Sequence, residues 1–126
     1  MGTHTEKGRP RVTDVHDLVR DLLDAEPRLA PVYREHLADN VELLIHVLLG
    51  DVTRWLRQNG PAAAVLAVLE RHLAGGDSDV QNAIAASFVE NLEPDDATIH
   101  QALGPGLRAE LQRQERWTPL DLDQPT

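Results

Sequence analysis

The sequence contains no cysteine, which excludes disulfide bonds, thiolate-bound zinc and cysteine nucleophiles and fits a reducing compartment. Aromatic residues make up only 3% of it, so few rings are available to stack on the bases of single-stranded nucleic acids. No apolar run is long enough to cross a bilayer, and the N-terminal segment MGTHTEKGRP lacks the apolar stretch of a secretory signal. We therefore expect a cytoplasmic protein that does not insert into a membrane.

Positive charge is scarce as well, since Lys7 is the only lysine. The 12 lysine and arginine residues are outnumbered by 21 acidic residues, which gives a formal net charge of −9. DNA and RNA binding needs clustered cations against the phosphates, so no nucleic-acid partner is expected. The length of 126 residues suits one domain with its own core, built from leucine, valine, isoleucine and alanine.

Apolar residues at helical spacing are what the sequence has in abundance. Val15, Leu18 and Leu22 recur three or four residues apart, and no segment alternates with the period of a strand. We therefore predict an all-α fold: a single-domain bundle or short helical array of six to seven helices. The predicted parts are a flexible N-terminus at 1–12, the helical domain at 13–117 and a C-terminal tail at 118–126. Within the domain, the third helix (41–60) and the fifth (77–93) are expected to be the most buried.

The predicted fifth helix carries the stretch DVQNAIAASFVENL, which mixes amides with apolar residues. On a helical wheel Phe88 falls on the apolar face, and Gln81 and Asn91 fall on the same side. Ser78 followed by Gln81 matches a capping box, and a buried amide needs hydrogen-bond partners. We therefore predict structural roles for both amides, with Gln81 reaching back to the Ser78 amide and Asn91 tying a neighbouring loop.

The opposite side of this helix and the segment after it are acidic. No lysine or arginine occurs between His72 and Leu107, so the acid has no compensation nearby in the sequence. One interpretation is a solvated face that keeps the protein soluble. The other is a docking surface for a basic protein partner. The candidate partner-binding residues are Asp79, Glu90, Glu93, Asp95 and Asp96.

Signatures of catalysis and metal binding are missing from the sequence. Its six histidines form neither an HExxH pair nor a Glu-x-x-His motif. Glu42 and His46 are one helical turn apart and could share a metal, but a surface or capping pair is the simpler interpretation. Ser87 lacks a Gly-x-Ser-x-Gly context. We therefore expect no catalytic residues, no metal ligands and no cofactor, and hence no enzyme.

The stretch GDVTRWL in the predicted third helix suggests packing roles. Gly50 is expected to allow a close approach of another helix, since glycine is costly in a helix interior. Asp51 and Arg54 are three residues apart and are expected to pair on the surface. Trp55 is expected in the core, whereas an exposed indole at this position would mark an interface.

The stretches LLIHVLLGDVTRWL and DVQNAIAASFVENLEP, with a leucine-rich helix between them, resemble a family of small uncharacterised bacterial all-helical proteins. Some of its members resemble immunity proteins encoded beside polymorphic toxins. The resemblance covers about residues 30–95. It implies a non-catalytic protein that neutralises a secreted bacterial toxin by binding it through an acidic surface. The alternatives are a structural or adaptor subunit of a bacterial assembly and a metal-dependent enzyme.

Overall fold

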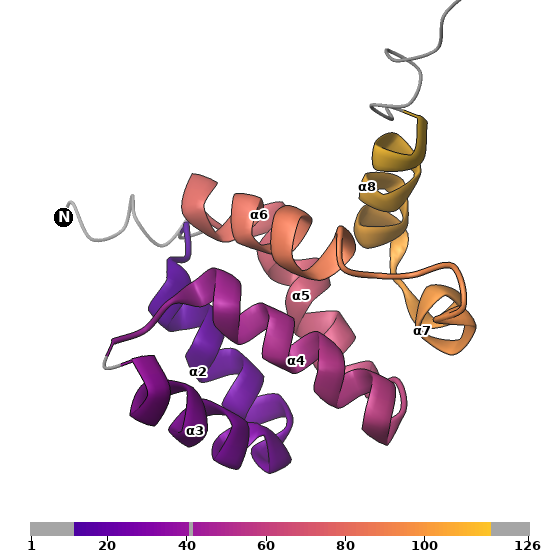
Figure 1. The fold of residues 1–126 in the computed structure, drawn as a ribbon. Helices are drawn as coiled ribbons and strands as arrows, with labels where there is room; N and C mark the ends of the chain where they lie inside the picture. The colour runs from indigo at the N-terminus through magenta and orange to yellow at the C-terminus, as the bar shows by residue number, and fades with distance from the viewer. Residues whose placement is uncertain (1–11, 41, 117–126) are drawn as a thin grey trace, which may run out of the picture.

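The computed structural model describes residues 12–40 and 42–116 of the chain. In these ranges the chain forms seven α-helices and no strand, which confirms the predicted all-α class (Figure 1). The helices are α2 (Val15–Ala25), α3 (Ala30–Asn40), α4 (Ile45–Asn59), α5 (Ala63–Gly75), α6 (Ser78–Ile84), α7 (Ala97–Ala102) and α8 (Pro105–Arg116). A 3-10 turn, η1 (Pro27–Leu29), precedes α3, and a π-helical turn, η2 (Ala85–Val89), continues α6.

The two predicted end segments lie almost wholly outside the described residues, and so does Trp117. None of the described helices is long and apolar enough to cross a membrane.

The start and end of α2 follow from local signals in the sequence. The Asp14 carboxylate accepts from the Asp17 amide (2.9 Å) and the Asp17 carboxylate accepts from the Asp14 amide (3.0 Å). This reciprocal capping satisfies amides that a helix N-terminus leaves without intrahelical partners, and both carboxylates suit the positive end of the helix dipole. The helix ends at Ala25, before Pro27.

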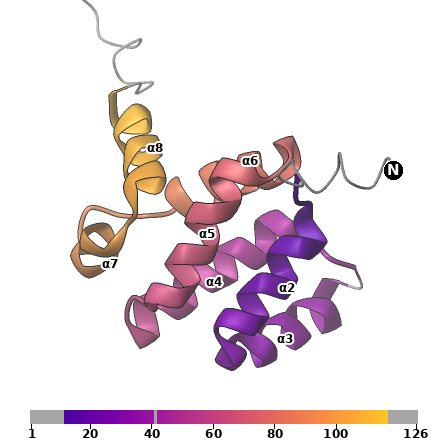
Figure 2. The ribbon, with the colours of Figure 1, turned by 180° about the vertical axis from the view of Figure 1, so that it is seen from behind.

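The core lies inside a block formed by α2 to α6 and η2 (Figure 1). Phe88 is fully buried among aliphatic side chains, as the low aromatic content predicts. Seen from behind, α5 lies beside α2, while α8 lies at the edge of the block, against α5 and η2 (Figure 2). The largest fully buried apolar side chains of the block are Leu18, Leu49, Leu56, Leu69, Ile84 and Phe88.

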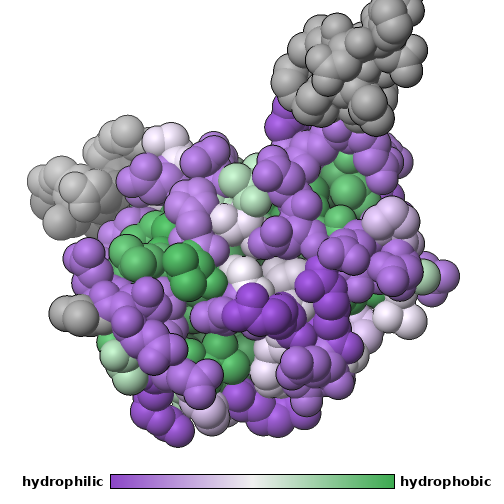
Figure 3. Space-filling model, in the orientation of Figure 1, coloured by the Kyte–Doolittle hydropathy of each residue, from purple (hydrophilic) through white to green (hydrophobic). Residues whose placement is uncertain are grey.

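The prediction that the third and fifth helices are the most buried is confirmed for the fifth, since α6 and its continuation η2 each bury three residues, and is wrong for the third. Helix α4 begins only at Ile45, and it buries five residues, the same number as α5. Leu44 and Val47 stay 38% and 46% exposed, and apolar surface gathers toward this end of α4 (Figure 3). Apolar periodicity shows which residues share a face of a helix, but it does not show which of those faces a neighbouring element covers.

The polar contacts at the ends of α6 differ from the predicted ones. Asp77, and not Ser78, caps the helix, because its carboxylate accepts from the Val80 amide (2.9 Å). Gln81 Nε2 donates to the Leu73 carbonyl (3.0 Å) and so satisfies the end of α5. Asn91 Nδ2 donates to the Ser87 carbonyl (2.7 Å) and closes its own helix rather than a neighbouring loop. Both amides therefore have structural roles, as predicted, but with other partners.

The GDVTRWL stretch behaves mostly as expected. Asp51 and Arg54 form an ion pair on α4. Trp55 is half-buried against the core, and the Arg28 guanidinium lies 5.0 Å from the centre of its ring. Gly50 faces Asn91, but a Cβ built on it would be 3.8 Å from Asn91 Nδ2, which is ordinary contact. Close packing therefore does not require a glycine here.

Two histidines, His36 and His72, are each only 2% exposed. Nε2 of His36 accepts a hydrogen bond from the Leu44 amide (3.0 Å), which fixes the connection between α3 and α4. His72 lies between Thr13 and Asp21, with its Nδ1 2.8 Å from the Thr13 hydroxyl and its Nε2 2.7 Å from Asp21 Oδ2. The segment before α2 and α2 itself are thus tied to α5 by one imidazole.

These contacts favour the ionised form of the Asp21 carboxyl. Its partial burial opposes ionisation, but the hydrogen bond and charge of His72, helped by Arg20 and Arg71, outweigh the burial and lower the pKa of Asp21. Asp21 is therefore ionised at neutral pH. An ionised carboxylate can only accept, so His72 Nε2–H donates to Asp21.

Candidate functional site

A groove runs between the α6–η2 helix and α8. It consists of two open hollows of about 530 and 270 Å³, which share Glu90 and Gln114 in their lining. We call this pair of hollows the α8 groove. The larger hollow is lined by Asn82, Ala85, Ala86, Glu90, Glu110, Arg113 and Gln114. The smaller hollow is lined by Val89, Glu90, Leu92, Pro94, His100, Leu111, Gln114 and Glu115.

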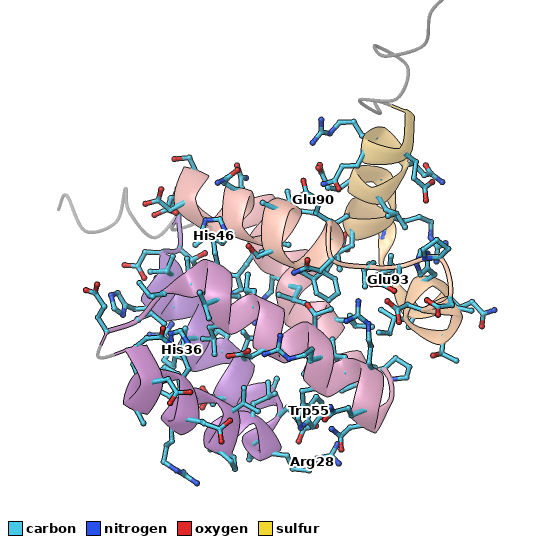
Figure 4. All side chains as sticks on the ribbon, in the orientation of Figure 1. Arg28, His36, His46, Trp55, Glu90 and Glu93 are labelled. Carbon is cyan, nitrogen blue, oxygen red and sulfur yellow. The ribbon has the colours of Figure 1, made fainter. Side chains whose placement is uncertain are left out.

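The π-helical turn η2 places Glu90 beside α8. The Glu90 amide donates to the Ala85 carbonyl (3.1 Å), five residues back, so this turn holds one residue more than an α-helical turn. Gln114 Nε2 on α8 donates to the same Ala85 carbonyl (3.1 Å). Figure 4 shows Glu90 where η2 ends close to α8, and Glu93 in the loop toward α7. π-helical turns are frequent at functional sites, and nothing in the residue pattern predicts this one.

Helix α8 is held at its first turn by a carboxylate from α5. The Glu70 carboxylate accepts from the amides of Gly106 and Leu107, the latter at 3.0 Å. These amides belong to a helix N-terminus, where an acceptor and a negative charge are both stabilising. A Cβ on Gly106 would be 2.5 Å from Glu70 Oε2, so the glycine leaves room for the carboxylate. The Gly-Pro-Gly segment at 104–106 therefore leads into α8, with Pro105 in its first position.

One wall of the α8 groove carries an internal ion pair. Glu110 pairs with Arg113 and accepts a hydrogen bond from Gln114 Nε2 (2.8 Å). Partial burial raises the pKa of Glu110, but the hydrogen bonds from Arg113 and Gln114 and the charge of Arg113 outweigh it and lower the pKa overall. Glu110 is thus ionised and already paired. These three residues were not predicted as site residues, although their i, i+3 and i+4 spacing is the usual one for pairs on a helix surface.

The predicted partner-binding residues occupy different places. Glu90 is exposed and lines both hollows, and Glu93 and Asp95 are exposed in the loop between η2 and α7. Asp79 is exposed in the first turn of α6. It precedes Glu90 by 11 residues, which is about 16 Å along a helix axis. Asp79 therefore lies away from the α8 groove.

Asp96 differs from the other four acids because it is paired. Arg57 of α4 forms an ion pair with its carboxylate (3.0 Å) and also donates to the Asn91 carbonyl. The Asp96 carboxylate accepts from the Glu93 amide as well (2.9 Å), and its side chain is only 10% exposed. The segment without lysine or arginine thus receives a cation from another helix. Within the described parts of the chain, the acids Asp79, Glu90, Glu93 and Asp95 make no ion pair.

The residues considered for metal binding or catalysis do not assemble a centre in the parts that the structure describes. No group of three or more histidine, aspartate or glutamate side chains there could hold a metal ion. Glu42 lies before the start of α4, so it is not one helical turn from His46. His46 Nδ1 lies 2.7 Å from the Ser87 hydroxyl instead, and this contact joins α4 to η2.

These observations define an all-helical domain with an acidic groove between the α6–η2 helix and α8. The chain belongs to the family of a domain of unknown function, DUF7674, whose family model matches residues 19–118. This range takes in most of α2 and all of α8, so it extends beyond the 30–95 segment on which the resemblance was based. No curated protein and no solved structure matches the chain.

Proposed function

We propose that this chain is a non-catalytic protein-binding domain, and specifically an immunity protein that neutralises a bacterial toxin in the cytoplasm. The observation that carries the proposal is the α8 groove, which has an exposed Glu90 at its centre. Glu93 and Asp95 add exposed negative charge beside it, and none of these three acids makes an ion pair with a described residue.

The charge of the whole protein supports a basic partner. With a formal net charge of −9, the chain attracts cationic surfaces, and toxins that act on nucleic acids or nucleotides are basic around their active sites. Charge complementarity of this kind speeds association and suppresses wrong partners. The VQN and SFVENL segments resemble a family some of whose members resemble immunity proteins, which points in the same direction.

The lining of the groove also suits a protein ligand. The smaller hollow combines apolar Leu92, Pro94 and Leu111 with Glu90 and Glu115. An apolar floor with a polar rim is typical of protein–protein interfaces. Both hollows are open, so side chains of a partner can enter them without a rearrangement of the backbone.

The test is a growth assay in bacteria. The product of the reading frame next to the gene is expressed alone and together with this chain. We expect growth to stop in the first case and to be rescued in the second. We also expect the association rate of the two purified proteins to fall as the salt concentration rises, because screening acts within about 10 Å at 0.1 M. A neighbouring product that is harmless, or that this chain does not bind, would contradict the proposal.

The exposed Leu44 and Val47 favour a second candidate, a structural or adaptor subunit of a bacterial assembly. Exposed apolar side chains that lie together mark protein contacts more often than scattered single ones do. A molecular mass in solution well above that of the 14.0 kDa chain, without rescue in the growth assay, would favour this function over the first.

A further inference from the structure

We propose that the α8 groove binds an arginine-bearing amphipathic segment of the partner protein. In this arrangement an arginine guanidinium lies against Glu90 and Asn82 in the larger hollow. An apolar side chain next to it enters the smaller hollow against Leu92, Pro94 and Leu111. The inference rests on the proposed function, since it names the part of the partner that the acidic surface recognises.

The larger hollow has the chemistry for one additional cation. Of its two carboxylates, Glu110 is already paired with Arg113 and hydrogen-bonded by Gln114. Glu90 is exposed and has no cation among the described residues. Asn82, two turns earlier on the same helix, is exposed and offers an amide oxygen as a second acceptor. A guanidinium has several N–H donors in one plane and can use both acceptors at once, whereas a lysine ammonium is a point charge.

The smaller hollow determines what lies beside that cation. Leu92 and Leu111 are half-buried, so each leaves apolar surface open to solvent. Apolar surface is visible at the base of α8, bordered by hydrophilic residues (Figure 3). Glu90 lines both hollows, so a single segment that crosses it contacts both. Two helices with a groove between them commonly hold an amphipathic helix by its apolar side.

The test uses defined peptides, so its result does not depend on the growth assay. A blocked synthetic peptide with arginine and leucine one helical turn apart is titrated into the full chain at low salt. Backbone amide NMR shifts report where it binds. Three further peptides replace the arginine with lysine, the arginine with glutamate, or the leucine with serine. We expect the arginine–leucine peptide to bind most tightly and to shift amides of α6, η2 and α8.

Two matched variants locate the binding. Glu90→Gln removes the charge from the groove, and Glu35→Gln removes one exposed charge from α3, on the other side of the molecule. We expect Glu90→Gln to weaken binding about twofold to fivefold, the range for an exposed ion pair, and Glu35→Gln to leave it unchanged.

Three results would overturn the inference. They are shifts confined to other helices, equal effects of the two variants, and equal binding of the arginine and lysine peptides. If the chain rescues growth but gives any of these results, the proposed function stands and only this binding mode is rejected. If the chain binds the peptide at Glu90 without rescuing growth, the proposed function is rejected and the binding site stands.

Discussion

The block, formed by α2 to α6 and η2, and the C-terminal arm, residues 90–116, differ in the interactions that stabilise them. Among the buried apolar residues in the described ranges, Ile99, Leu103 and Leu107 lie in the arm, and the others lie in the block. The arm is attached by these apolar side chains and by polar contacts, which are the Arg57–Asp96 ion pair, the Glu70 carboxylate on the first turn of α8, and the Gln114–Ala85 hydrogen bond.

This difference bears on the groove, because the groove lies between the two regions. Apolar burial stabilises the block in proportion to the area removed from water and tolerates small shifts. Hydrogen bonds and ion pairs depend on distance and angle, so each anchor of the arm fixes the position of α8. Elements with few buried apolar contacts open at a lower free energy than the core does. The width of the groove therefore depends on a few polar side chains as well as on the apolar residues of the arm.

The largest expected effect concerns the block. Phe88→Ala removes a fully buried ring from η2, so we expect the free energy of unfolding to fall by about 3–5 kcal/mol. Urea denaturation followed by circular dichroism measures this loss. Glu93→Ala in the arm is the control and is expected to change stability by less than about 0.5 kcal/mol. A loss below about 1 kcal/mol for Phe88→Ala would mean that the core does not depend on this ring.

The next effect is expected in the arm alone. Glu70→Ala leaves the amides of Gly106 and Leu107 without their carboxylate, which costs about 0.5–2 kcal/mol for a helix cap. We expect hydrogen exchange to become faster in α8 and to stay unchanged in α2 and α4. Glu70→Gln keeps an oxygen acceptor but loses the charge, so its exchange rate in α8 should lie between those of the wild type and Glu70→Ala. If exchange became faster throughout the chain, the arm and the block would be one cooperative unit.

Apolar periodicity was sufficient to predict the helices of the block, but not their exact ends or their burial. The capping of α2 at Asp14 and the stops before Pro27 and Pro61 all depend on residues close together in the sequence. The true caps show the limit of such signals, because Ser78 and Asp77 are equally plausible and only Asp77 makes the hydrogen bond.

The groove could be predicted only in part, because its contacts join residues far apart in the sequence. Glu90 was identified from its place on the acidic side of a helix. Its partner wall on α8 was not, since the Glu70–Gly106 contact spans 36 residues and the Arg57–Asp96 pair spans 39. The absence of lysine and arginine between His72 and Leu107 suggested an uncompensated acidic surface, but Arg57 folds onto it. Contacts of this kind between distant residues produce no recognisable pattern in the local sequence.

A pH series tests the polar contacts of the block itself. The pKa of Asp21 lies below its ordinary value of 3.8, so its ionised form contributes stability above that pH. This contribution is lost as the pH falls through the lowered pKa in the folded protein. We expect Asp21→Asn to reduce stability at pH 7 and to flatten the loss below about pH 4, as measured by urea unfolding at each pH. If Asp21→Asn lost stability at low pH as steeply as the wild type does, other carboxylates would account for the acid sensitivity.

The smallest expected effect is a gain in stability where the block meets the arm. Gly50 lies in the interior of α4, and a Cβ there would be in ordinary contact, 3.8 Å from Asn91 Nδ2. Gly50→Ala should therefore raise the free energy of unfolding by up to about 1 kcal/mol, because alanine is the better helix former. Gly76→Ala is the matched control, since its Cβ would lie 2.4 Å from Val80 Cγ1 and 2.6 Å from the His72 carbonyl oxygen. We expect the control to lose stability in the same urea titration. A loss for Gly50→Ala would instead show that α4 and Asn91 approach each other closely enough to require glycine, and that the boundary between block and arm is packed as tightly as the core.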